Sequence, residues 1–197
     1  MTLLPLFRWA LRSLAAGLLL AAARVLVLVL MLAGNARADG VEVSRLAATR
    51  QDGVLALDFA VRLALPRTVE EALYRGVPVY FVAQATLYRA RWYWRDERVA
   101  RVARSWRLAY QPLTSTWRVG LGGLNQSYPT LGEALAAVSS IPGWRLAELA
   151  QIDADSRYTI EFSYQLDTTQ LPSPMQIGLG GQAEWAIGIE RLLRLDP

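Results

Sequence analysis

The 197-residue chain contains no Cys, His or Lys, so its 21 basic residues are all Arg, and this composition excludes disulfides, Cys or His catalysis and Lys-dependent cofactors. Its formal net charge of +4 arises in the first 38 residues, which hold four Arg and no acidic residue, so the other 17 Arg balance all 17 Asp and Glu. The remainder is formally neutral and lacks the basic footprint of a nucleic-acid binder.

The N-terminal segment has the features of a Sec signal peptide. Arg8 and Arg12 precede two apolar runs, residues 14–23 and 25–32, which Arg24 separates. An uncleaved membrane anchor is the alternative, because the apolar side chains outweigh the cost of about 3 kcal/mol for one central Arg. In both cases the basic N-terminus stays inside the cell.

A cleavage site follows these apolar runs. Ala36 and Ala38 are the small residues of the small-x-small cleavage pattern. We therefore predict that residues 1–38 are removed and that a single mature domain, 39–197, begins at Asp39. The domain is expected in the periplasm or, with an uncleaved anchor, on the periplasmic side of the inner membrane.

The mature chain begins with a predicted hairpin and a short helix. Apolar residues alternate with polar or small ones over 55–63, which is typical of a strand with one buried face. The partner strand is expected at 41–48, joined through Asp52-Gly53. Thr68 and Glu71 form a capping box that predicts a helix ending at Gly76.

The next segment is rich in β-branched and aromatic residues. We predict one long strand over 77–94, a polar turn at 95–98 and an antiparallel return over 99–111, followed by a strand at 116–121. In such a strand Trp92 and Trp94 would share one face and Tyr93 the other, so at least one of these groups is expected in the core.

The second half is expected to contain a helix and further strands. Thr130 and Glu133 form a second capping box, which opens a short helix that Pro142-Gly143 ends. Residues 158–166 alternate most clearly in the chain. The remaining expectations are a loop at 122–129, strands at 144–149 and 185–189, and a Pro-containing loop at 167–174.

These elements predict a mainly β fold. Seven or eight strands joined by turns, with two short helices, are typical of an antiparallel β-sandwich. An α+β fold is the alternative. No internal repeat or second domain boundary is visible.

Three sequence blocks, 88–96, 108–119 and 166–176, resemble an exported proteobacterial family labelled "proline-rich signal peptide protein", domain of unknown function four-three-nine-zero. The most specific block is Arg-Trp-Tyr-Trp-x-Asp at 91–96, and this chain has Ala90 where the family is expected to have Pro. The resemblance implies no activity and no catalytic residue, and it implies a role near envelope sensing.

One segment carries candidate contact residues. Seven Arg fall between residues 89 and 107 against two acidic residues, interleaved with aromatic rings. This composition suits an anionic or sugar-like ligand, or a protein partner. The alternative is structural, with Arg packed on aromatic rings across a hairpin. The candidates are Arg89, Arg91, Trp92, Tyr93, Trp94 and Asp96.

Other possible chemistry would depend on Gly-rich segments, an Asp-rich segment or paired carboxylates. The Gly-rich segments 120–123 and 178–181 match no phosphate-binding fingerprint and are read as turns. The Asp-rich segment 153–156 lacks the later ligands of an EF-hand and is read as a polar turn. We predict no metal and no cofactor. A hydrolase would need a carboxylate pair, and the candidates are Asp58, Asp96, Glu161 and Asp167.

The sequence therefore favours a non-catalytic binding or protein-interaction module of the cell envelope, with an unknown envelope protein or an anionic ligand as its partner and with no nucleic acid. Membrane contact is expected only through the leader, if it is uncleaved. The alternatives are a carboxylate-dependent envelope hydrolase and a structural envelope component, which an exposed apolar patch would indicate.

Overall fold

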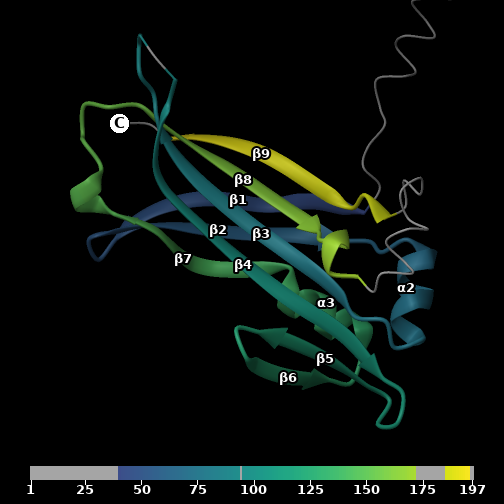
Figure 1. Cartoon of the computed structure of the whole chain (residues 1–197). Coiled ribbons are helices and arrows are strands. Elements are labelled where there is room, and N and C mark those ends of the chain that lie inside the picture. The colour runs from purple at the N-terminus through teal and green to yellow at the C-terminus, as the bar shows by residue number, and fades with distance from the viewer. Residues whose placement is uncertain (1–39, 94, 172–184, 196–197) are drawn as a thin grey trace, which may run out of the picture. The chain divides into compact units, whose positions relative to one another are not determined.

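The computed structural model describes residues 40–93, 95–171 and 185–195. In this part of the chain nine antiparallel strands form two sheets (Figure 1). The predicted leader and cleavage site, Trp94, and the Pro- and Gly-containing segment 172–184 lie outside the described residues.

The mainly β prediction with two short helices is confirmed. One sheet has three strands in the order β1-β2-β7, and the other has six in the order β6-β5-β4-β3-β8-β9. The elements are β1 Val41–Gln51, β2 Val54–Leu63, α2 Arg67–Tyr74, β3 Val79–Arg89, β4 Glu97–Gln111, β5 Thr116–Leu121, β6 Leu124–Tyr128, α3 Leu131–Val138, β7 Ser140–Glu148, β8 Tyr158–Leu166 and β9 Gly188–Leu195.

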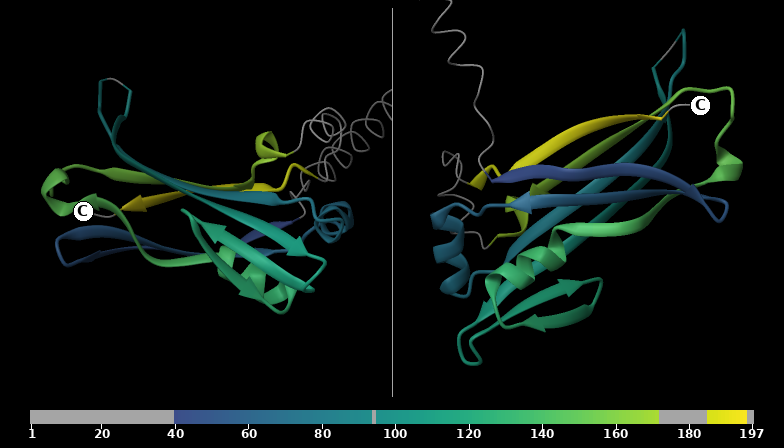
Figure 2. Two further views of the ribbon diagram at one scale, coloured as in Figure 1. Left: turned by 60° about the horizontal axis from the view of Figure 1, so that its bottom comes forward. Right: turned by 180° about the vertical axis from the view of Figure 1, so that it is seen from behind.

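The two sheets pack face to face around an apolar core (Figure 2). The alternation of β2 turns Leu55, Leu57 and Phe59 inward, where all three are buried. The centroid of the Phe59 ring lies 4.9 Å from that of Phe162 on the six-stranded sheet and 5.8 Å from that of Trp144 on its own sheet. Aromatic rings at such distances pack favourably across a sandwich, so this cluster fixes the two sheets on each other.

The predicted capping box of α3 is confirmed. The backbone N–H of Glu133 donates to the hydroxyl of Thr130 at 3.2 Å. At the other end of the helix, the buried hydroxyl of Tyr164 donates to the carbonyl of Val138 at 3.1 Å. Burial raises the pKa of this phenol, so Tyr164 stays a neutral donor that ties α3 to the core.

The capping box predicted for α2 is wrong. The helix begins at Arg67, with Pro66 at the N-cap and no side-chain capping bond. Thr68 lies inside the first turn, and Glu71 instead pairs with Arg67. Proline already has the φ that a helix start requires, so the chain enters the helix two residues earlier. Gly76 follows the helix with φ +82°, as expected.

Two glycine-containing segments also depart from the prediction. Gly122 and Gly123 both have positive φ and make a tight turn, so 124–128 forms strand β6 where a loop was expected. Pro142 and Gly143 lie inside β7, where its register against β2 shifts. The N–H of Gly143 donates to Asp58 at 2.6 Å, and this bond holds the bulge.

The last strand begins later than the alternation indicates. Trp185 and Ile187 are buried, as expected of an inward-facing pair. The strand β9 itself runs over Gly188–Leu195 and pairs antiparallel with β8. It therefore forms one edge of the six-stranded sheet, beside the clearest predicted strand.

Candidate functional site

The β3–β4 hairpin ends in a projecting tip. Strand β3 stops at Arg89 and β4 starts at Glu97, so the prediction of a strand to residue 94 is wrong. We call the described connecting residues, 90–93 and 95–96, the hairpin tip. It rises from the six-stranded sheet on the side away from the three-stranded sheet (Figure 2, left). Among the described residues, no strand pairs with the chain beyond Arg89 on either side, so β-forming residues there do not extend the strand.

A network of ion pairs fixes the base of the tip. Arg89, whose side chain is 29% exposed, pairs with both Glu97 and Asp153, and Arg91 pairs with Glu97 at 2.5 Å. The hydrogen bonds from Arg89 and then Arg91 lower the pKa of the Glu97 carboxyl. The Glu97 hydrogen bond likewise raises the pKa of Arg89. Because Asp153 lies in the loop between β7 and β8, the network joins the hairpin to a second segment.

A backbone contact strengthens this connection. The N–H of Ala90 donates to the carbonyl of Arg157 at 2.9 Å, just before β8 begins. The N–H of Arg91 makes a longer bond of 3.4 Å to Asp96 across the tip. The polar turn predicted at 153–156 therefore has a role that sequence alone does not reveal, since it supports the tip.

The aromatic side chains of the tip point into solvent. Trp92 is 92% exposed and Tyr93 is 65% exposed. Their rings contact each other edge to face, with centroids 4.9 Å apart. The expectation that one of these groups fills the core is wrong for both described residues, because they lie beyond the paired strands. Trp106 of β4 is buried instead.

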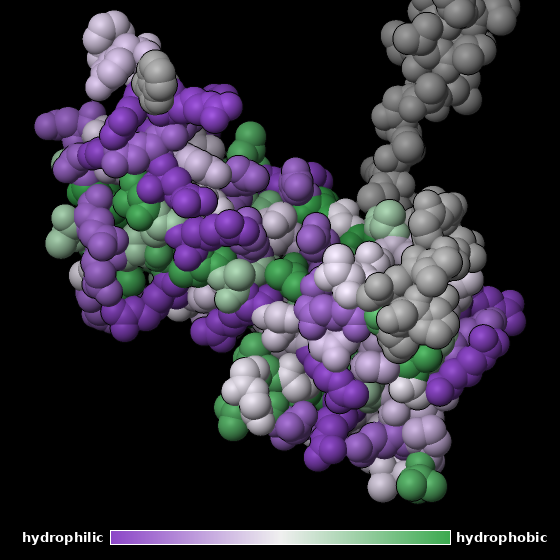
Figure 3. Space-filling model, viewed as in Figure 1, coloured by the Kyte–Doolittle hydropathy of each residue, from purple (hydrophilic) through white to green (hydrophobic). Residues whose placement is uncertain are grey.

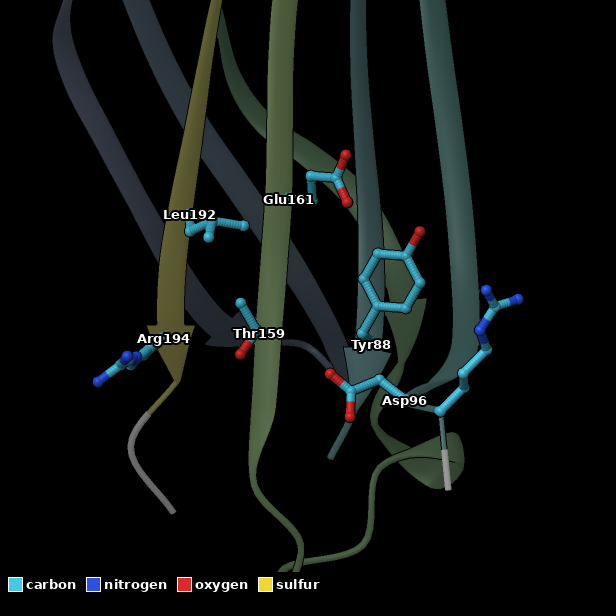
Figure 4. Close-up of a pocket in the computed structure, with 7 residues that line it drawn as sticks. Tyr88, Asp96, Thr159, Glu161, Leu192 and Arg194 are labelled. Atoms are coloured by element: carbon cyan, nitrogen blue, oxygen red, sulfur yellow. The ribbon is translucent and has the colours of Figure 1, made fainter. Parts of the chain in front are cut away.

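An open depression of about 690 Å³ lies on the outer face of the six-stranded sheet, against the tip (Figure 4). Tyr88 opposes Thr159 across strands, and Thr159 opposes Arg194. Glu161 likewise opposes Leu192. Three adjacent strands therefore supply the floor. The tip supplies the remaining lining residues, Arg95 and Asp96.

Of the four candidate carboxylates, two line the depression and two do not. Asp58 holds the β7 bulge, and Asp167 accepts bonds from Thr169 and Gln170, which lower its pKa. Asp96 and Glu161 are brought together at the depression. Within the described residues, neither of these two forms an ion pair.

Sequence reasoning found part of this site. Of its candidates, the structure places Asp96 at the depression, Arg89 and Arg91 in the supporting network, and Trp92 and Tyr93 at the end of the tip. Besides Tyr88 and Arg95, which are chain neighbours of its candidates, it missed Thr159, Leu192 and Arg194. No local signal marks these three, because only the pairing of β8 with β9 and of β3 with β8 assembles them.

The described residues hold no group of three or more acidic side chains that could bind a metal ion. Neither of their two α-helices is long and apolar enough to cross a membrane.

A family model described as "Domain of unknown function (DUF4390)" matches residues 38–193. The match confirms the family that the three sequence blocks resemble, but it does not extend to the label "proline-rich signal peptide protein". Searches of curated proteins and of solved structures gave no match.

Proposed function

Since the chain belongs to the family described as a domain of unknown function, we propose its role from the site: it is an exported, non-catalytic module that binds another component of the cell envelope through the hairpin tip. The exposure of Trp92 and Tyr93 on a braced support carries this proposal. The family resemblance adds a link to envelope sensing.

Because the Trp92 and Tyr93 rings are exposed, they contribute little to the stability of the fold. Their position is therefore not explained by packing. Trp and Tyr are large apolar side chains that gain free energy when they leave water. Together with Arg, they are the residues that most often carry the binding energy of protein interfaces. The tip combines Trp92 and Tyr93 with Arg91, and this composition suits contact with another protein.

The ion-pair network prepares the tip for binding. A loop that becomes ordered only on binding loses conformational entropy at that step. Arg89 bridges Glu97 and Asp153, and Ala90 is bonded to Arg157. The ends of the tip are therefore held before a partner arrives, which reduces this cost.

Export is proposed from the leader. The family match begins at residue 38, so all of the predicted signal peptide except its last residue lies outside the matched domain. N-terminal sequencing of protein purified from its native cells, combined with fractionation, tests the proposal. A periplasmic form that begins at Asp39 is expected. A membrane-bound form that retains the leader would support the anchored alternative, whereas a cytosolic form that begins at Met1 would contradict export.

The binding role is tested by crosslinking in the native envelope, followed by mass spectrometry. The double variant Arg91→Ala with Trp92→Ala should lose the crosslinked partner and keep a nearly unchanged melting temperature. The matched control is Arg45→Ala with Leu113→Ala, which removes one exposed Arg and one exposed large apolar side chain outside the tip. A large loss of melting temperature with unchanged crosslinking would make the tip a structural element.

A carboxylate-dependent hydrolase is the second candidate, because Asp96 and Glu161 share the depression. A general acid at neutral pH needs a sheltered carboxyl with a raised pKa, whereas this depression is open to solvent. Hydrolysis of an envelope glycan by the purified protein, abolished in both Asp96→Asn and Glu161→Gln, would favour the enzyme over the binding module.

A purely structural role is less well supported. Away from the tip, the exposed large apolar side chains of the described residues are scattered over different elements: Tyr74 in α2, Leu113 after β4, Leu124 in β6 and Leu192 in β9. They do not form the broad apolar patch that such a role would need.

A further inference from the structure

The outer face of the six-stranded sheet is strongly basic although the mature chain is neutral. Inward positions of β3 such as Phe81 and Leu87 are buried, so the residues that alternate with them, and their cross-strand neighbours, face outward. We call this outward surface, together with the adjoining side of the tip, the basic face. Its charged residues are Arg95, Arg98, Arg101, Arg107, Arg118 and Arg194 against Asp96, Glu161 and Glu190.

The arginines of the basic face differ from several other arginines in their ionic contacts. In the part of the chain that the structure describes, none of the six forms an ion pair, and the guanidinium of Arg101 donates only to the neutral amide of Gln84, at 2.6 Å. Elsewhere, Arg62, Arg67 and Arg145 each pair with a nearby Glu. Like charges gathered on one face repel one another, so the basic face lowers stability rather than raising it.

The shape of the basic face selects the kind of partner. The tip rises from the sheet like a wall, and the depression occupies the corner between tip and sheet (Figures 2 and 4). Hydrophilic side chains dominate this end of the face (Figure 3). A flat lipid surface cannot touch both the sheet and the side of the tip that faces it. An elongated polypeptide segment can lie on the sheet with one end against the tip.

We propose that the basic face binds an acidic polypeptide segment of the partner protein. The inference rests on the proposed binding role and adds the chemistry of the partner. Arg101 and Arg107 lie on the same outward row of β4, about 20 Å apart at the usual rise of a strand. Since salt screens charges beyond about 8 Å under physiological conditions, each Arg acts on the nearest carboxylates. The partner therefore needs several acidic residues spread along its length.

The test uses a probe of known composition. A fluorescein-labelled peptide of alternating Glu and Val is titrated with the purified protein, and its anisotropy is followed at low and high salt. Binding is expected at low salt, with an affinity that falls as the salt concentration rises. The matching peptide of alternating Lys and Val should not bind.

Charge-reversal variants locate the binding. Arg101→Glu with Arg107→Glu should weaken binding of the Glu peptide by about tenfold or more. The matched control is Arg45→Glu with Arg104→Glu. Arg104 lies in the same strand but opposite buried Ala83, on the other side of the sheet, and Arg45 lies on the three-stranded sheet. The control should change the affinity by less than about twofold. Equal losses in both double variants would overturn the inference, because they would show an effect of overall charge.

Two further outcomes are decisive. Binding to vesicles of phosphatidylcholine with phosphatidylglycerol, without binding to the Glu peptide, would assign the basic face to a lipid surface and overturn the inference. In the native envelope, the Arg101 and Arg107 double variant should lose the crosslinked partner. If only the tip variant loses it, the acidic partner is wrong and the binding role stands. If neither variant loses it, the binding role fails as well.

Discussion

Replacement of Trp92 by Ala should leave the domain almost as stable as the parent protein. The side chain is 92% exposed, so folding buries only about 20 Å² of a Trp surface, which is worth about 0.5 kcal/mol. The edge-to-face contact with Tyr93 adds about 0.5 kcal/mol at such an exposed site. We therefore expect the free energy of unfolding to fall by about 1 kcal/mol at most.

Trp106 provides the matched comparison within the same hairpin. It is 3% exposed, pairs with Phe81 across strands and lies with its ring centroid 6.3 Å from that of Tyr164. Replacing a buried Trp by Ala removes its apolar area from the core and leaves a cavity, at a cost of about 3–5 kcal/mol. The two tryptophans should thus differ by at least about 2 kcal/mol.

Urea unfolding followed by far-UV circular dichroism measures both variants on the same scale. The parent and Trp92→Ala should have nearly the same midpoint, while Trp106→Ala should unfold at clearly lower urea with a similar slope. A loss of more than about 2 kcal/mol in Trp92→Ala would refute the reasoning. It would mean that the tip packs onto the domain and that its aromatic rings serve the fold.

Three other substitutions test the supports of the site and of the sheets. The pKa of Glu97 in the folded protein is lowered below its ordinary 4.5. The ionised carboxylate therefore stabilises the fold fully above the pKa of the unfolded state, and this stabilisation disappears as the pH falls through the pKa of the folded state. Glu97→Gln should flatten this acid-side loss, which urea unfolding measures as the pH is lowered below about 4.5. Gly143→Ala should cost about 1 kcal/mol in the same assay, because Gly143 has φ +60° and an added Cβ would meet no neighbour. Thr68→Val should raise the free energy of unfolding by about 1 kcal/mol and the melting temperature with it. Within the described residues, the buried Thr68 hydroxyl has no hydrogen-bond partner.

The strands with one buried face could be predicted from the sequence because their periodicity records burial directly. Residues 158–166 alternate along β8, and the structure buries every second one from Tyr158 to Leu166. The same holds for Leu55, Leu57 and Phe59 in β2. In these strands the chemical pattern and the tertiary environment have the same period. The two-sheet fold followed from such segments without any knowledge of their pairing.

The prediction that the strand over 77–94 includes the tip was wrong for a related reason. Trp92 and Tyr93 have high β-propensity, but that propensity reflects packing on a half-buried sheet surface. At the described residues 90–93 and 95–96 neither β4 nor β8 pairs with the chain, so no sheet surface is present on which these side chains could pack. Aromatic residues that remain outside the sheet are then candidates for contact with another molecule. The departure from the local pattern is what draws attention to the site.

The depression could not be predicted because its residues belong to segments far apart in the chain. Asp96 and Glu161 were both candidate carboxylates, yet nothing in their spacing indicates that they line one surface. Pairing of β3 with β8 places Glu161 next to Thr86, and the tip brings Asp96 to the same end. Arg194 joins them only because β9 returns beside β8.

The net charge of the whole domain does not predict which charged partners its surface can bind. Equal numbers of Arg and acidic residues suggest a surface without preference for charged partners. The fold sorts these charges, since acidic residues pair with Arg between β1 and β2, in α2 and in β7, while Arg98, Arg101 and Arg107 share the outward side of β4. Screening makes the local arrangement, not the total, decide what an approaching chain encounters. A neutral domain can therefore present a basic face. Because the tip is held in place at one end of that face, a partner segment can lie along the sheet with one end against the tip.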